Sequence, residues 1–141
     1  MKPNILIIED EEIMRVSLQD SLSAEGCVVH SFANGLEGTS AFKEHEFSLV
    51  ITDVRLPDIT GFDVLKALKN LNESVPVIVM TAFGTIKDAV NAMKHGAFDY
   101  ITKPFSLEEV PSRVQASLGG DLGLTGGSVA TIETGATIKN E

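Results

Sequence analysis

The chain has one cysteine, one tyrosine, no tryptophan and no long hydrophobic run. Because Cys27 is the only cysteine, no internal disulfide can form, and this residue is expected to pack in the core. The apolar run near the N-terminus spans no more than five residues before four acids follow at positions 9–12. We therefore expect no signal peptide, no membrane span and a cytoplasmic protein.

Basic residues are also scarce, and the formal net charge is −9. Direct binding of nucleic acid is not expected, since phosphate binding needs a basic surface. The chain has 141 residues, of which 43% are hydrophobic and only 22% are charged. This composition predicts one globular domain with a substantial core and argues against disorder.

Five short apolar runs alternate with five helical patterns along the chain. The runs are typical of buried strands, which are expected at residues 5–8, 28–32, 49–53, 76–81 and 98–102. Strands that alternate with helices favour a parallel sheet covered on both faces, and right-handed crossovers leave few topologies. The predicted fold class is α/β: a doubly wound, five-stranded parallel sheet of order 2-1-3-4-5, flavodoxin-like, with helices on both faces.

Local signals mark the expected ends of the helices. Three helices are expected to begin with a capping residue and a polar partner three positions later: Asn34 with Glu37, Thr85 with Asp88, and Ser106 with Glu109. Pro111 falls about five positions into the last of these helices, where it removes a hydrogen bond and crowds the preceding turn. We therefore expect the last helix to kink or to start late.

The composition changes after Leu118. Residues 1–118 are expected to form the domain, whereas residues 119–141 are a glycine-rich tail. The tail could be a weak hairpin, the remnant of a linker to a missing domain, or an artificial extension. An isolated hairpin is marginal in water, so the tail is expected to be poorly ordered unless it packs on the domain.

Polar side chains that suit phosphoryl chemistry follow the ends of four expected strands. They are Glu9 and Asp10 after the first, Asp53 on the third, Thr81 on the fourth and Lys103 after the fifth. In the predicted sheet these groups converge on the edge where open parallel sheets bind ligands. Clustered carboxylates favour a hard cation such as Mg²⁺, while a lysine and a hydroxyl can hold phosphoryl oxygens. A carboxylate nucleophile completes such a set.

Two other classes of protein remain open at this point. An aspartyl-phosphate phosphohydrolase would want a second acid two residues after Asp53, where Arg55 stands. A flavodoxin-like binding module would want a phosphate-cradling loop after the first strand, where the acids at 9–12 would repel phosphate. The three histidines lack metal-ligand spacing and are expected to be surface or packing residues: His30, His45 and His95.

The chain resembles the receiver domain of two-component response regulators over about residues 4–118. The resemblance is carried by residues 5–11 (ILIIEDE), Asp53 with Leu56, Pro57 and Gly61, residues 81–82 (TA) and residues 100–105 (YITKPF). Residues 81–84 and 89–100 look most like receivers of NtrC-type activators of sigma-54 transcription. The resemblance implies that Asp53 accepts a phosphoryl group from a phosphohistidine on a sensor histidine kinase.

The resemblance also implies a cofactor and a switch. Mg²⁺ would be bound by Asp10, Asp53 and the backbone carbonyl of Arg55, with Glu9 acting through water. Lys103 would hold a phosphoryl oxygen, and its peptide bond to Pro104 would be cis. Thr81 would move toward the phosphoryl group, and Tyr100 would turn into the vacated space.

The implied function is a phosphorylation-controlled signalling module and not an enzyme acting on other substrates. Its own chemistry would be phosphoryl transfer to Asp53 and slow autodephosphorylation. The switch would control a face made by the fourth helix, fifth strand and fifth helix. That face would regulate homodimerisation or an output domain absent from this chain, in the control of transcription. A receiver that has lost phosphorylation is the remaining alternative.

Overall fold

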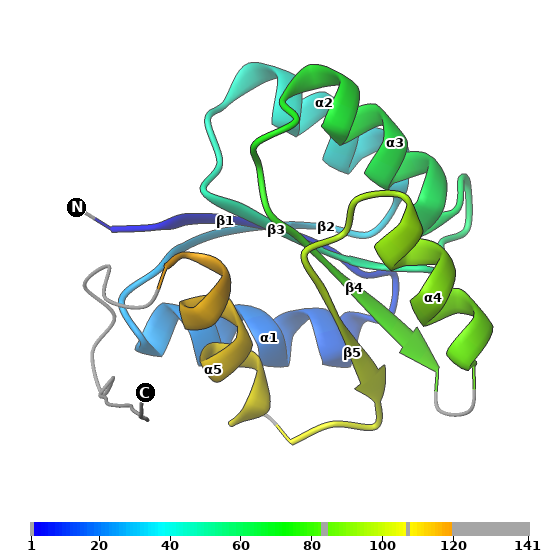
Figure 1. Ribbon diagram of the computed structural model, residues 1–141. Helices are drawn as coiled ribbons and strands as arrows, with labels where there is room; N and C mark the ends of the chain where they lie inside the picture. Colours follow the sequence, from blue (N-terminus) through cyan, green and yellow to red (C-terminus); the bar gives the residue numbers. More distant parts are fainter. Residues whose placement is uncertain (1, 83–84, 107, 120–141) are drawn as a thin grey trace.

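A computed structural model describes residues 2–82, 85–106 and 108–119. Its strands are β1 (Asn4–Ile8), β2 (Val28–Phe32), β3 (Leu49–Asp53), β4 (Val77–Ala82) and β5 (Asp99–Lys103). They alternate with the helices α1 (Glu12–Ala24), α2 (Gly35–Glu44), α3 (Gly61–Leu71), α4 (Ile86–Lys94) and α5 (Glu109–Ser117). All strand pairs are parallel, in the order β2-β1-β3-β4-β5, which confirms the predicted fold (Figure 1).

The sheet separates two apolar cores. One core packs side chains of α2 and α3 against it, and the other packs side chains of α1 and α5. Figure 1 shows these two helix pairs on opposite sides of the sheet. The central strands β1 and β3 are buried on both faces, which is why they are near-continuous apolar runs without alternation. Cys27 is buried in the second core, as expected.

The bounds of three strands differ from the prediction by one residue. The first strand begins at Asn4 instead of Ile5. The fourth strand begins at Val77 instead of Pro76, because proline has no N–H to donate to a ladder, although its carbonyl still accepts from the N–H of Val50. The fifth strand begins at Asp99 and ends at Lys103. Lys103 therefore lies on the strand end itself and not in the loop after it.

Of the three predicted helix caps, one is confirmed and two are wrong. The side chain of Asn34 accepts a hydrogen bond from the N–H of Glu37 at 2.9 Å. The hydroxyl of Thr85 instead donates to the carbonyl of Ala82, so it makes no cap. The last helix has Glu108 at its N-cap, with no side-chain cap there, in place of the expected Ser106 and Glu109 capping box.

The late start predicted for the last helix is confirmed. α5 begins at Glu109, so Pro111 is its third residue. Proline is tolerated in the first turn because the N–H groups there have no intrahelical acceptor. The glycine-rich residues 120–141 and the pair 83–84 lie outside the described residues. Among the residues that are described, no helix combines the length and the apolar character needed to span a membrane.

Candidate functional site

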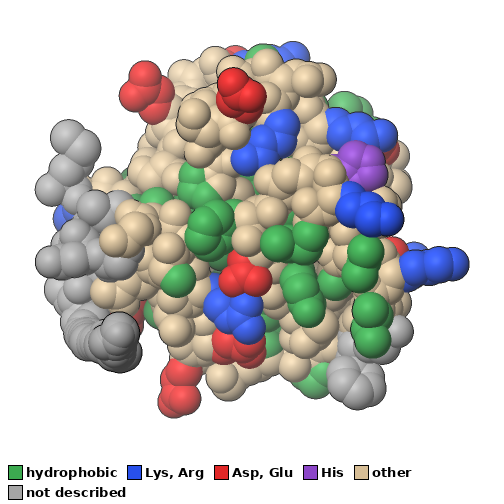
Figure 2. Space-filling model, in the orientation of Figure 1, with side chains coloured by type: hydrophobic (Ala, Val, Ile, Leu, Met, Phe, Trp, Pro, Cys, Tyr) green, Lys and Arg blue, Asp and Glu red, His purple; other side chains and the backbone are tan. Residues whose placement is uncertain are grey.

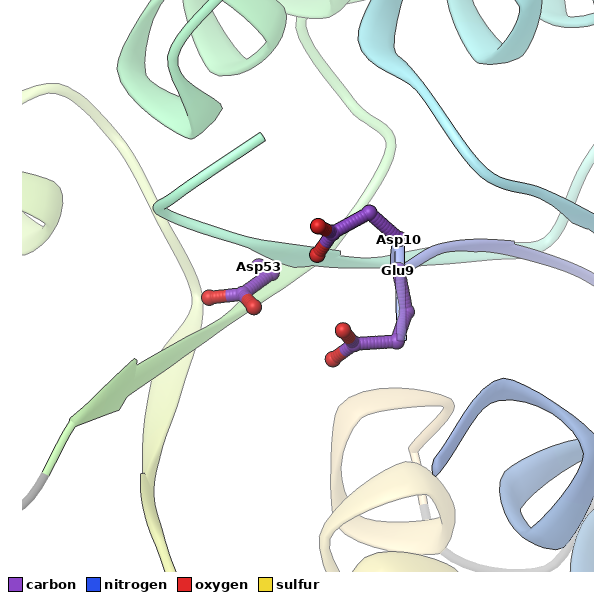
Figure 3. A group of neighbouring side chains, drawn as sticks. All are labelled: Glu9, Asp10 and Asp53. Atoms are coloured by element: carbon purple, nitrogen blue, oxygen red, sulfur yellow. The ribbon is translucent and has the colours of Figure 1, made fainter. Parts of the chain in front are cut away.

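Three carboxylates meet at the carboxyl edge of the sheet. Glu9 and Asp10 follow β1 directly, and Asp53 is the last residue of β3, the strand that pairs with β1. One oxygen from each carboxylate lies within 4.8 Å of the others. Figure 3 shows the three side chains facing a common space at the strand ends. The structure thus brings together the acids that the sequence placed at the ends of neighbouring strands.

Lys103 brings a cation from the far side of β4 to this acidic cluster. Its Nζ lies 2.6 Å from Oε1 of Glu9 and 2.9 Å from Oδ2 of Asp53. Burial acts to lower the pKa of Lys103, but its hydrogen bonds to the two carboxylates outweigh burial and raise this pKa. Lys103 therefore stays charged and holds the ends of β1, β3 and β5 together. Its peptide bond to Pro104 is cis.

Glu9 is fully buried, and each of its carboxylate oxygens has a partner. Oε1 accepts from Lys103, and Oε2 accepts from the N–H of Glu11 at 3.0 Å. Burial raises the pKa of Glu9, the charge of Asp53 adds to this, and the two hydrogen bonds act in the opposite direction. Glu9 and Asp53 thus share one lysine, which makes the cluster electrostatically dependent on Lys103.

The chain closes tightly after Asp53. The N–H of Arg55 donates to Oδ1 of Asp53 at 3.3 Å, and the N–H of Gly61 donates to the carbonyl of Val54 at 2.7 Å. A Cβ atom at Gly61 would lie 2.3 Å from the carbonyl oxygen of Asp53. Only glycine fits at this position, because the start of α3 approaches the end of β3 so closely.

Thr81 lies on β4, between the strands that carry Asp53 and Lys103. It is fully buried, and within the described part of the chain its hydroxyl has no hydrogen-bond partner. A buried unpaired hydroxyl costs roughly 1–3 kcal/mol, so it marks a site where a partner is expected during function. Tyr100, the other predicted switch residue, is 38% exposed on β5 and pairs with Val79 of β4. The pairing places Tyr100 on the same face of the sheet as Thr81.

Two features of the site region, and one contact away from it, could not be predicted from the sequence. Arg15 of α1 donates to the carbonyls of Glu9 and Asp10 at 2.8 and 3.3 Å, and so fixes the loop that carries the acid pair. Asp58 links the loop after β3 to α2. Away from the site, the rings of His30 and His45 stack with centroids 5.8 Å apart. They are packing residues, as expected, but no local pattern predicts that they meet.

Comparison with known proteins places this chain in a family. The model of the response regulator receiver domain matches residues 5–115. The uncharacterized transcriptional regulatory protein YkoG of Bacillus subtilis is 44% identical over 117 residues, which cover 83% of this chain and 51% of that protein. The DNA-binding transcriptional regulator NtrC of Proteus hauseri is 31% identical, over 83% of this chain and 25% of that protein. This match bears out the resemblance to NtrC-type receivers.

Solved structures of receiver domains also match this chain. A response regulator receiver domain protein from Clostridium thermocellum superposes with a TM-score of 0.79 at 29% identity, covering 83% of this chain and 94% of that one. This chain spans about half the length of the first curated relatives that it matches. Its matched segment carries the acidic cluster, Thr81 and Lys103, all within residues 5–115. The chain therefore belongs to the response regulator receiver domain family.

Proposed function

We propose that Asp53 accepts a phosphoryl group from a phosphohistidine on a sensor histidine kinase. The observation that carries this proposal is the position of Asp53: its carboxylate ends a central strand, 2.9 Å from the ammonium of Lys103 and within 4.8 Å of two more carboxylates. In the transfer, an oxygen of Asp53 forms a bond to phosphorus as the P–N bond to the imidazole breaks. The nitrogen keeps the electron pair and regains a proton from solvent.

The donor set fits Mg²⁺. Three carboxylates and one lysine leave two negative charges in the cluster, and every ligand atom is an oxygen, as this hard cation prefers. Asp10, Asp53 and the carbonyl of Arg55 would hold the ion, with Glu9 acting through water, as the resemblance to receiver domains implies. When bound, the ion supplies positive charge that offsets the repulsion between the carboxylates and the incoming phosphoryl oxygens.

Two side chains of the chain itself would stabilise the transferred group. Lys103 already lies against Asp53 and would hold a phosphoryl oxygen as a point charge. The hydroxyl of Thr81, buried and unpaired in the described part of the chain, would donate to another. Movement of Thr81 toward the phosphoryl group would open space on its face of the sheet for Tyr100 to turn inward.

The surface that would respond is made by α4, β5 and α5. Large exposed apolar side chains gather there: Ile86, Val90, Met93, Phe98 and Tyr100. Figure 2 shows hydrophobic side chains collected between charged ones over α4 and β5. Exposed apolar patches of this kind suit protein partners. This face would mediate homodimerisation or control of an output domain, and the names of the relatives favour transcription as the output.

The working unit would be residues 1–118 in the cytoplasm, with residues 119–141 as a linker or an added tail. The domain would catalyse only phosphoryl transfer to itself and slow loss of that group. It would depend on a kinase for its signal and on an output domain outside this chain for its effect.

Intact mass spectrometry tests the proposal. The wild type, Asp53→Asn and the matched control Asp20→Asn, which changes an exposed acid of α1, are incubated with Mg²⁺ and a small acyl phosphate. The wild type and Asp20→Asn are expected to gain one phosphoryl group each, and the gain should disappear with EDTA. A wild type that gains nothing, or an Asp53→Asn variant that gains as much, would overturn the proposal and indicate a module that works without phosphorylation.

A further inference from the structure

The loop that follows Asp53, residues 54–60, carries the backbone carbonyl assigned above to the metal. Four hydrogen bonds fix the ends of this loop. Val54 N–H donates to the carbonyl of Met80 and Arg55 N–H to Asp53 Oδ1, while Thr60 N–H donates to Asp63 Oδ2 and Gly61 N–H to the carbonyl of Val54. None of these four bonds involves residues 56–59. Its outer half, around residues 57–59, needs a separate support if the carbonyl of Arg55 is to stay in place.

Asp58 supplies a support from another part of the chain. Its Oδ1 accepts from the N–H of Gly35 at 2.9 Å, and its Oδ2 accepts from the N–H of Leu36 at 2.8 Å. These are the first two N–H groups of α2, which have no acceptor within the helix. Although desolvation acts to raise the pKa of Asp58, the backbone N–H groups that it accepts from outweigh this and lower it. The carboxylate is therefore ionised at neutral pH and bridges two N–H groups.

The residue after Asp58 packs on the same helix end. A Cβ atom built on Gly35 would lie 2.5 Å from Cγ1 of Ile59, so the side chain of Ile59 occupies the space that the glycine leaves. The loop thus meets the start of α2 through a charged hydrogen-bonded contact and an apolar contact, side by side. The start of α2 is a fixed surface because Asn34 caps it through Glu37 N–H.

We propose that Asp58 is a positioning residue for the Mg²⁺-dependent chemistry at Asp53. By tying residues 54–60 to α2, it holds the carbonyl of Arg55 where the metal needs it, although Asp58 itself lies outside the acidic cluster. This inference rests on the function proposed above. Groups that orient metal ligands typically contribute about tenfold or more to metal affinity.

A matched pair of variants separates positioning from stability. Asp58→Ala removes a partner of α2 and releases the loop, whereas Asn34→Ala removes a cap of the same helix and leaves the loop attached. Mg²⁺ affinity is measured by calorimetric titration, the stability of each variant by urea unfolding, and the rate of phosphorylation at limiting and at saturating Mg²⁺.

We expect Asp58→Ala to weaken Mg²⁺ binding about tenfold, and Asn34→Ala to leave it unchanged while lowering stability to a similar extent. Asp58→Asn, which keeps one acceptor oxygen, should lie between. Saturating Mg²⁺ should restore the phosphorylation rate of Asp58→Ala, since its chemistry is intact. Equal Mg²⁺ affinity in the wild type and Asp58→Ala, or an equal loss in both alanine variants, overturns the inference alone. A wild type that binds no Mg²⁺ overturns the proposed function as well.

Discussion

Replacing Lys103 with methionine removes a charge and keeps most of the side chain's length. In the wild type the ammonium lies 2.6 Å from the fully buried Glu9 and 2.9 Å from Asp53, and the lysine side chain is 22% exposed. Loss of one partner from a buried ion pair costs about 3–5 kcal/mol, because the remaining charge is left uncompensated. The partial exposure of Lys103 places the expected loss near the lower end, about 3 kcal/mol. For a domain of this size that is a drop in Tm of about 10 °C.

The assay is urea unfolding followed by far-UV circular dichroism at neutral pH with EDTA. Lys66→Met, on the exposed side of α3, is the control and is expected to change stability by less than about 0.5 kcal/mol. The double variant Lys103→Met/Glu9→Gln should recover part of the loss, since the amide removes the charge of the fully buried Glu9, whereas Asp53 still lacks its cation. Mg²⁺ should also restore part of the stability of Lys103→Met, because a bound cation replaces the missing one.

One result would refute this reasoning. If the free energy of unfolding of Lys103→Met in EDTA lies within about 0.5 kcal/mol of the wild-type value, the lysine does not compensate the negative charge of the carboxylates. A double variant no more stable than Lys103→Met would refute the pairing with Glu9 specifically, because the two changes would then act independently.

Three further predictions follow from the geometry. Thr81→Val should leave the free energy of unfolding unchanged or raise it by about 1 kcal/mol, because an unpaired buried hydroxyl is removed, while mass spectrometry should show less phosphorylated product. Gly61→Ala should lower the free energy of urea unfolding by about 1–3 kcal/mol, because the added Cβ meets backbone atoms of β3. The lowered pKa of Asp58 stabilises the fold above the usual aspartate value of about 3.9. The difference in Tm between wild type and Asp58→Asn should therefore be constant near neutral pH and disappear as the pH falls below that value.

The sequence predicted the architecture because the strands are its strongest local signal. Buried parallel strands need apolar side chains on both faces, and such runs stand out against the polar loops. Once the sheet order is set, the polar residues after each run must share one edge. Glu9, Asp53, Thr81 and Lys103 could be grouped on that basis without a single coordinate.

Capping signals were less reliable because the backbone before the helix decides whether a side chain can cap. At Asn34 the backbone is extended, with φ −144° and ψ 163°, and this lets the side chain accept a hydrogen bond from the N–H of Glu37. Thr60, with φ −81° and ψ 161°, also has an extended backbone and forms a capping box with Asp63 that was not predicted. At Thr85 ψ is 62°, and at Glu108 the backbone is already helical. Neither side chain makes a cap, although the spacing near both suits one.

Contacts between distant segments could not be predicted from the sequence, for a different reason. Asp58 reads as an ordinary turn residue, and its bonds to Gly35 and Leu36 span 23 and 22 positions. Arg15 reads as an exposed helix residue, yet it binds backbone carbonyls next to the acidic cluster. A backbone group that serves as a hydrogen-bond partner cannot be recognised from the sequence, because almost every residue carries the same N–H and C=O groups.

The bond between Glu9 and Lys103 joins residues 94 positions apart. Closing a loop of that length costs entropy, and the cost is offset only when the intervening strands are in place. Contacts between residues so far apart in the sequence therefore form slowly. A growing or partly unfolded chain can contain Asp53 and its neighbours on β1 and still lack the lysine. Competence to receive a phosphoryl group would then be a property of the finished domain alone, and a kinase that transfers to Asp53 would act only on chains whose last strand has already joined the sheet.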